Sequence, residues 1–498
     1  MLLLGIDLGT SSIKASVVDA ATQKCIASAQ YPETEVDIIS TQTGWAEQSP
    51  DLWWEHVQQA ILKCNATDLY DPKDIAAIGI AYQMHGLVLV DKQQHVLRNS
   101  IIWCDSRAVG IGDKAFDKMG QEKCLSHLLN SPGNFTASKL AWVKANEPEL
   151  YELIDKLLLP GDFIAMKFSG ETTTTASALS EGIFWDFKEH CLSKDVLDYF
   201  GFDPSFFAKL QPVFSDHGRL KESVASGLSL KPGIPVAYKA GDQLNNAFSL
   251  QVLHPGEIAA TAGTSGVIYG ISDHLEYDPQ SRINSFAHVN HDLQTNRIGV
   301  LLCINGAGIF NRWIKNMFGA QASYCSLNLA AGKVPIGAEG LLSLPFGNGA
   351  ERMLNNKIPG AHFHNLDFNI HSSAHLVRSA QEGIAFAFRY GLDIMKENGV
   401  DPSVIRAGKA NMFLSDVFAQ SFVNTTGVPV ELHKTDGSVG AALGAALGAG
   451  MLKEGDLIAG KKALSVIDPV HQDVYEELYG QWKELLEVQL QKIKKIDS

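Results

Sequence analysis

The 498-residue chain lacks the features that define several large classes of protein. No apolar run reaches the roughly 20 residues that a membrane-spanning helix needs, so no membrane association is expected. Asp7 interrupts the apolar N-terminus before the core of a secretory signal can form. The seven cysteines are scattered and include no Cys-x-x-Cys pair, which predicts free thiols in a reducing compartment. These absences together predict a cytoplasmic protein.

Positive charge is also scarce. The chain has 41 Lys and Arg against 55 Asp and Glu, a formal net charge of −14. Nucleic-acid-binding proteins normally carry a basic stripe, so nucleic acid is not an expected partner. Hydrophobic residues make up 45% of the chain, as in folded globular proteins, and its length exceeds what one hydrophobic core usually supports. Two or more domains are therefore expected.

Short strands mixed with helices predict an α/β protein. Strands are expected at Leu2–Ile6, Ile13–Asp19, Ile75–Ala81 and Leu87–Asp91, and helices from Pro50, over Gln381–Glu397 and over Gly437–Ala449. Ser49 is a candidate cap for the helix that begins at Pro50. In the last of these helices, glycines recur every four residues, which leaves a bare face that a strand or helix can approach closely.

One strand–turn–strand pattern occurs twice. Leu2–Ile6 leads into Gly9-Thr10-Ser11-Ser12, and Glu257–Thr261 leads into Gly263-Thr264-Ser265-Gly266. Turns of this composition suit phosphate, because their amide and hydroxyl groups donate hydrogen bonds and no bulky Cβ obstructs the oxygens. Two copies half a chain apart predict two related domains, residues 1–247 and 248–498, with both turns facing one cleft. Asp7, directly before the first turn, is close enough to hold Mg²⁺ through water.

Several short motifs follow one another along almost the full chain. They are Gly5–Lys14, Gly44–Gln48, Trp103–Arg107, Gly241–Gln243, Gly263–Ser265 and Gly440–Ala442. In their order and spacing they resemble the FGGY family of carbohydrate kinases, which is related to actin and hexokinase. This resemblance implies two ribonuclease-H-like (actin/hexokinase-like ATPase) domains, with sugar and ATP meeting in the interdomain cleft.

The resemblance also implies a nucleotide site. Matching the family's motifs, the expected ATP contacts are Thr10, Ser11, Ser12 and Lys14 from the first domain and Thr264, Gly308, Gly408 and Asn411 from the second. Mg²⁺ is expected with the ATP, with Asp7 as its ligand. The chain departs from the family between positions 407 and 411, where Lys409 and Ala410 stand in place of consecutive glycines.

Asp242 corresponds to the catalytic base of the family and is expected to contact the sugar. Met84 and His85 are the other expected sugar ligands, because Gln83-Met84-His85-Gly86 is similar to the xylulokinases and gluconokinases of the family. A methionine suits the carbon face of a sugar, and an imidazole exchanges hydrogen bonds with its hydroxyls. Glycerol kinases carry an Arg-Glu pair at this point, which the chain lacks.

These residues predict an ATP-dependent kinase for a small-molecule sugar, most simply a pentulose kinase that converts D-xylulose to D-xylulose 5-phosphate. A gluconokinase or another polyol or ketose kinase is the alternative, and a non-catalytic ATP-dependent sensor is a more distant one. Glu351-Arg352 resembles a family segment but lacks its Thr-Pro, and is interpreted as structural. With no arginine assigned to the cleft, gluconate is expected to be a poor substrate. A homodimer is an open alternative to a monomer.

Overall fold

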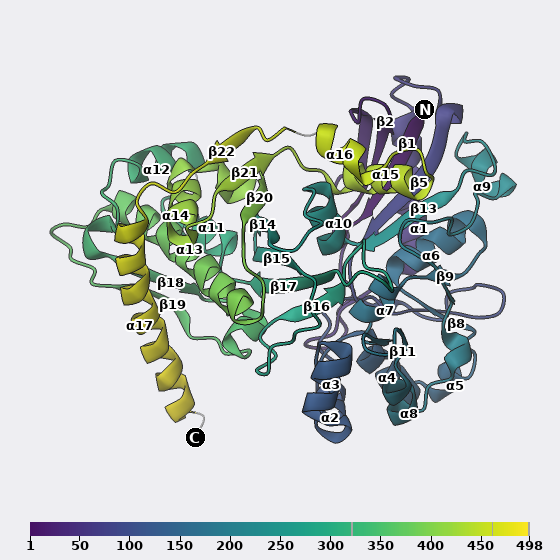
Figure 1. The fold of residues 1–498 in the computed structure, drawn as a ribbon, viewed down its shortest axis with the longest axis horizontal. Helices are drawn as coiled ribbons and strands as arrows, with labels where there is room; N and C mark the ends of the chain where they lie inside the picture. Colours follow the sequence, from purple (N-terminus) through teal and green to yellow (C-terminus); the bar gives the residue numbers. More distant parts are fainter. Residues whose placement is uncertain (320–321, 461, 497–498) are drawn as a thin grey trace.

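The computed structural model of the protein describes residues 1–319, 322–460 and 462–496. Two sheets organise the fold, one in each half of the chain (Figure 1). The first has the order β13-β5-β1-β2-β3. Its strands are β1 (Leu2–Leu8), β2 (Ile13–Asp19), β3 (Cys25–Tyr31), β5 (Ile75–Tyr82) and β13 (Val236–Gly241).

The second sheet has the order β16-β17-β15-β14-β20-β21-β22. Its strands are β14 (Glu257–Ala262), β15 (Gly266–Ser272), β16 (Asn284–Ala287), β17 (Ile298–Ile304), β20 (Val404–Gly408), β21 (Val430–His433) and β22 (Ser465–Ile467). In both sheets the strand–turn–strand unit is antiparallel, and its first strand pairs in parallel with a later one, β5 or β20. The predicted α/β architecture with two similarly built halves is confirmed.

The side chains of β1 alternate between two helical layers, as expected for a central strand. Leu4, Ile6 and Leu8 pack with residues of α1 (Pro50–Asn65) and α6 (Pro160–Ser169) on one face. The predicted start of α1 is confirmed, because the Ser49 Oγ accepts a hydrogen bond from the Leu52 amide at 3.4 Å. The odd-numbered residues of β1, Asp7 among them, therefore face the opposite layer.

Helix α15 (Gly437–Gly448) forms that opposite layer, beside β1 and β5 in Figure 1 although it comes from the end of the chain. Its glycine face is confirmed as a close contact: a Cβ on Gly444 would lie 2.6 Å from the Tyr238 ring, and one on Gly448 would lie 1.8 Å from the Ala237 carbonyl oxygen. The sequence did not predict that its partner is the first sheet. This packing brings the start of α15 onto the Asp7 side of β1.

Other helices complete the two halves. Between β6 (Val88–Val90) and β13 the chain forms α2 (Val109–Met119), α3 (Gln121–Leu128), α4 (Thr136–Asn146), α7 (Ala176–Glu181) and α8 (Lys194–Phe200). Helices α13 (Ser373–Glu397) and α14 (Asp416–Thr426) pack against the second sheet, and α11 (Gly308–Met317) and α17 (Gln472–Ile496) pack against α13. Within the described ranges, no helix is both long enough and apolar enough to cross a bilayer.

Candidate active site

A cavity of about 670 Å³ lies between the two halves of the molecule. Both Gly-hydroxyl turns reach it, through Thr10 from the first and Ser265 from the second. The predicted arrangement, with the two turns facing one cleft, is confirmed. The polar side chains that line the cavity include His85, Asn134, Asp242, Gln243, Asn284, Asn305, Glu351 and Arg352.

Asp242 lies at the end of β13, as the first residue of α10 (Asp242–Ser249). The preceding residue must be small, because a Cβ on Gly241 would lie 2.7 Å from the Met84 Cγ. This close approach brings Met84 beside the Asp242 turn. Burial, followed by the charge of Asp7, raises the pKa of Asp242 to about 7, against hydrogen bonds from Gln243 that lower it. A carboxylate with a near-neutral pKa is well matched to accept a proton from a sugar hydroxyl.

His85 lines the same cavity from the loop after β5. Its Nδ1 lies 2.9 Å from the carbonyl oxygen of Glu181. A carbonyl only accepts hydrogen bonds, so Nδ1 carries the proton and Nε2 is left as an acceptor. Burial lowers the pKa of His85 to about 3, so the ring is neutral at physiological pH. A neutral acceptor of this kind suits the hydroxyl group of a sugar.

Two buried side chains fix the unusual backbone of His85, whose φ is +63°. The His85 amide donates to the Glu181 Oε2 at 3.3 Å, and its carbonyl accepts from the Lys139 Nζ at 2.9 Å. The Tyr82 hydroxyl donates to the other Glu181 oxygen at 2.5 Å. Sequence reasoning missed both supports, because a single Glu or Lys within a helical segment gives no signal of burial.

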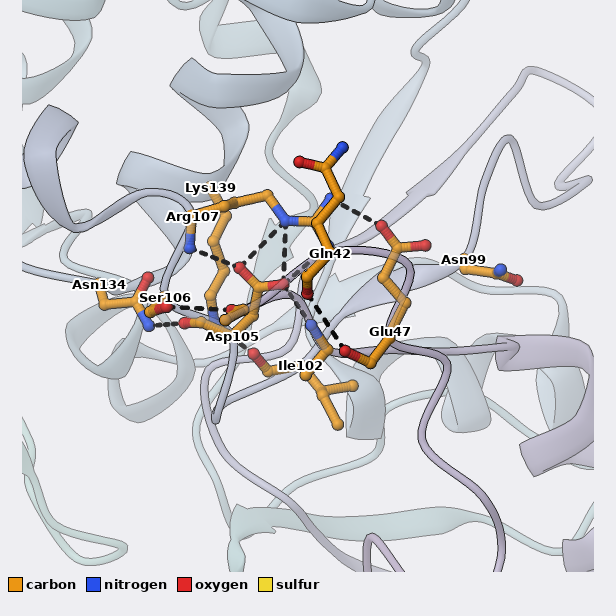
Figure 2. Close-up of polar contacts among 12 residues, drawn as sticks. Gln42, Glu47, Asn99, Ile102, Asp105, Ser106, Arg107, Asn134 and Lys139 are labelled. Carbon is orange, nitrogen blue, oxygen red and sulfur yellow. Dashed lines mark hydrogen bonds and ion pairs between the residues drawn. The ribbon is translucent and has the colours of Figure 1, made fainter.

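The Trp103–Arg107 motif forms one wall of the cavity, and Figure 2 shows how it is held. The Arg107 Nη2 lies 2.7 Å from the Asp105 Oδ2, and its guanidinium lies 3.8 Å from the centre of the Trp45 ring. The Asp105 carbonyl accepts a hydrogen bond from the Asn134 side-chain amide. No role for this motif was predicted from the sequence, although it is one of the motifs on which the resemblance rests. It rigidifies the loop that places Trp103 at the cavity.

Asp7 and α15 meet at the first Gly-hydroxyl turn. A Cβ on Gly437 would lie 2.1 Å from the Asp7 Oδ2, so only glycine fits at the start of this helix. Burial, followed by the charge of Asp436, raises the pKa of Asp7 to about 6. The Lys14 Nζ lies 2.5 Å from the Asp436 Oδ2, so Lys14 is ion-paired. Contact of Lys14 with ATP phosphates stays a prediction.

The residues around this turn suit Mg²⁺ bound together with phosphate. Among the residues with described positions, no three His, Cys, Asp or Glu side chains gather into a metal site. Mg²⁺ usually keeps several waters and takes only one or two carboxylates besides substrate phosphates. Asp7 and Asp436 are placed to provide these. Ser11 is exposed and Ser12 half-buried beside them, and their predicted phosphate contacts remain predictions.

The structure brings three of the other predicted nucleotide residues together. The amides of Gly308 and Ile309 donate to the carbonyl oxygens of Gly263 and Thr264, at 2.9 and 3.0 Å. Gly308 must be glycine, because its Cβ would lie 2.2 Å from the Gly263 oxygen. The Asn411 Nδ2 lies 3.6 Å from where a Gly263 Cβ would be. Gly308 and Asn411 therefore lie beside the second Gly-hydroxyl turn, to which Thr264 itself belongs.

Gly408 has a different neighbour. It ends β20, and a Cβ on it would lie 2.6 Å from the Thr435 Oγ1, on the connection between β21 and α15. The adjacent Lys409 amide donates to the His433 carbonyl oxygen at 2.8 Å. A nucleotide contact by Gly408 stays a prediction.

Glu351 and Arg352, which the sequence analysis interprets as structural, lie at the cavity. Both side chains line the cavity, and the Arg352 Cζ lies 5.2 Å from the centre of the Phe135 ring across the cleft. The premise that no arginine lies at the cleft is therefore wrong. Their position at the cavity was missed because the family's Thr-Pro is absent after them. The Glu-Arg pair itself was the feature of the sequence that could have indicated it.

Comparisons with known proteins agree with this geometry. Residues 2–249 match the N-terminal domain, and residues 258–452 the C-terminal domain, of the FGGY family of carbohydrate kinases. A xylulose kinase of Escherichia coli is 29% identical over 455 residues, which cover 89% of this chain and 88% of that protein. The structure of a xylulose kinase from Rhodospirillum rubrum has a TM-score of 0.88 at 24% identity, covering 98% and 99% of the two chains. A gluconate kinase from Lactobacillus acidophilus has a TM-score of 0.89 at 22% identity, covering 99% of each.

Proposed function

Because the chain belongs to the FGGY family of carbohydrate kinases, we propose that it phosphorylates a pentulose, converting D-xylulose to D-xylulose 5-phosphate with ATP as the donor. The observation that carries this proposal is the presence of Asp242, Met84 and a neutral, hydrogen-bond-accepting His85 at one cavity. The name of the Escherichia coli relative supports the choice of D-xylulose.

Asp242 acts as the general base. Its carboxylate orients the attacking hydroxyl and takes the hydroxyl proton as the new O–P bond forms. Phosphoryl transfer has a loose transition state, so correct positioning matters more than early removal of this proton. His85 Nε2 accepts a hydrogen bond from another hydroxyl and holds the sugar chain in register. Met84, only 5% exposed, offers an apolar surface to the carbon chain.

The first Gly-hydroxyl turn and Asp7 serve the phosphates. Bound Mg²⁺ supplies positive charge that neutralises the phosphate oxygens, and Asp7 and Asp436 are the residues that would hold it. Thr10, Ser11 and Ser12 donate hydrogen bonds from the first domain, and Thr264 donates from the second. Gly308 contacts the nucleotide from the start of α11, and Gly408 and Asn411 contact it from the end of β20 and the turn after it.

Gluconate is the second candidate substrate. The specific observation in its favour is Arg352, a cation at the cavity that could receive a carboxylate. D-xylulose remains the first choice, because Asp7, Asp242 and Glu351 add negative charge near the same space.

The test is a comparison of kcat/KM for D-xylulose, D-ribulose, gluconate and glycerol under identical conditions. We expect the highest value for D-xylulose and the lowest for glycerol, which is too short to reach all the polar groups. A clear preference for gluconate or glycerol would contradict the pentulose assignment.

A further inference from the structure

Arg352 reaches the sugar cavity from the second half of the molecule. It belongs to the short helical turn Glu351–Leu354, whose first residue, Glu351, has a φ of +45°. Across the cleft, its guanidinium stacks on Phe135. Gly133 makes room for it, since a Cβ there would lie 2.4 Å from the Arg352 Nη2. The guanidinium therefore spans the gap between the two halves at the cavity wall.

The hydrogen-bonding capacity of this guanidinium is largely unused. Its Nη1 donates to the Ser281 Oγ at 3.1 Å, and no ion pair joins it to a carboxylate among the described residues. Burial lowers the pKa of Arg352 to about 10, against the nearby charges of Glu351 and Asp113. An arginine has five N–H groups, and those of a partly buried guanidinium that lack an acceptor cost free energy. A ligand oxygen at this place would supply what the protein does not.

Several other polar groups at the cavity are acceptors. The side-chain oxygens of Asn134 and Asn284 are buried and receive no hydrogen bond, and both residues line the cavity. His85 Nε2 and Asp242 also accept. These groups match the protons of sugar hydroxyls, whereas Arg352 can only donate. The named acceptors therefore suit a chain of hydroxyl groups, and Arg352 suits an oxygen that carries no proton.

A carbonyl or carboxylate oxygen fits Arg352 better than a hydroxyl group. Such oxygens only accept, and their partial or full negative charge strengthens a hydrogen bond to a cation. Reduction of a ketone to an alcohol leaves a weaker acceptor and adds a proton that needs another partner. A site built for particular hydrogen bonds rejects an analogue that cannot make them.

We propose that Arg352 is a specificity-determining residue that donates hydrogen bonds to an acceptor-only oxygen of the sugar, a ketone or a carboxylate. The enzyme accordingly selects oxo sugars over alditols. This inference deepens the proposed function and rests on it for the position of the sugar. It concerns the class of substrate, so it can be tested separately from the choice of D-xylulose.

The experiment compares each oxo sugar with its reduced partner. D-xylulose is paired with xylitol and D-arabinitol, which differ from it only by reduction at C2, and gluconate is paired with D-glucitol. Wild-type kcat/KM should be higher for the oxo member of at least one pair. Arg352→Met should lower that value about 10–100-fold, as expected for a lost charged hydrogen bond, and change the value for the alditol less than about threefold. Arg352→Lys should retain part of the discrimination.

Arg219→Met provides the matched control, because Arg219 is exposed, paired with Asp216 and outside this cavity. It should leave both ratios unchanged. Melting temperatures of all variants check that the fold is intact. Equal losses for oxo sugar and alditol in Arg352→Met, or a wild type that uses alditols as well as oxo sugars, would overturn the inference. If gluconate rather than D-xylulose shows the Arg352-dependent ratio, the pentulose assignment fails and the role of Arg352 stands.

Discussion

The two Gly-hydroxyl turns share a backbone but differ in charge. In the first, Asp7 pairs with Lys14 across the two strands, one position before the end of the ladder. In the second, the corresponding pair is Thr261 and Val267. The same local fold therefore carries an acid and a base in one half and two uncharged side chains in the other. Backbone shape alone does not determine what each turn binds.

The helices at the two turns reinforce this difference. At the first, α15 brings Asp436 beside Asp7, and Asp436 pairs with Lys14. At the second, the start of α11 contributes the backbone amide of Gly308, which bonds the carbonyl of Gly263. We infer a division of labour, with metal and phosphate chemistry at the charged turn and nucleotide binding at the neutral one.

The largest expected effect comes from Asp242→Asn, which removes the base while leaving both turns intact. We expect kcat to fall by on the order of 10²–10⁴. Its folded pKa of about 7 lies above the ordinary value, so the ionised carboxylate destabilises the fold above pH 7, and stability rises as the pH falls. The amide should therefore raise the free energy of unfolding at pH 8 by about 1–3 kcal/mol, with little change near pH 4.

Steady-state ADP release and melting curves at pH 8 and pH 4 check this prediction. Unchanged ATP binding is the control, since the nucleotide contacts lie elsewhere. A correctly folded variant with nearly full turnover would show that another group is the base.

The next test removes the acidic side chain at the first turn and, for comparison, alters the equivalent residue at the second. Asp7→Asn should lower kcat/KM about 10–100-fold and raise the Mg²⁺ concentration needed for half-maximal rate, because it removes an expected metal ligand. Thr261→Val, at the equivalent position, should change either quantity less than about threefold. The measurement is a Mg²⁺ titration of the rate at saturating ATP. Equal effects of the two substitutions would contradict the inference that metal and phosphate bind at the charged turn and the nucleotide at the neutral one.

A smaller effect is expected from pH. Because Asp242 must be ionised to accept a proton, kcat/KM should fall about tenfold per unit below its pKa of about 7. Protonation of Asp7, whose pKa is about 6, should steepen the fall below pH 6. His85 stays neutral over this range. Lys139 also has a pKa of about 7, so a second measurement is needed to distinguish it from Asp242. The residual activity of Asp242→Asn, measured over the same pH range, should lack the fall just below pH 7. A fall that persists in Asp242→Asn would assign the titration to Lys139.

The smallest effect concerns α15, the helix that packs on the first sheet beside the charged turn. Gly444→Ala should destabilise the fold by about 1–3 kcal/mol, because the added Cβ would overlap the Tyr238 ring. Gly480→Ala, within α17 and with open space around it, should stabilise by about 0.5–1 kcal/mol. Denaturant melts of both variants give the two values. A stabilising effect of Gly444→Ala, like that expected of Gly480→Ala, would mean that α15 does not pack closely on the first sheet.

Local patterns predicted the repeated turns, the start of α1 and the bare face of α15, because each is encoded by neighbouring residues. The partner of α15 was not predictable, since a glycine face shows that something approaches but not which sheet. Arg352 was misread for a similar reason. Its position at the cavity depends on Phe135 and Gly133, more than 200 positions away in the chain, which leave space for its side chain.

The central claim is that the cavity between the two turns transfers phosphate to a sugar. Its most direct test is ADP release by the wild-type protein with ATP and Mg²⁺, measured with and without D-xylulose. We expect stimulation by D-xylulose on the order of 10²-fold or more, because water is a poor substitute for a positioned hydroxyl group. Equal rates with and without D-xylulose and the other sugars of the panel would contradict it, and would favour a non-catalytic ATP-dependent sensor.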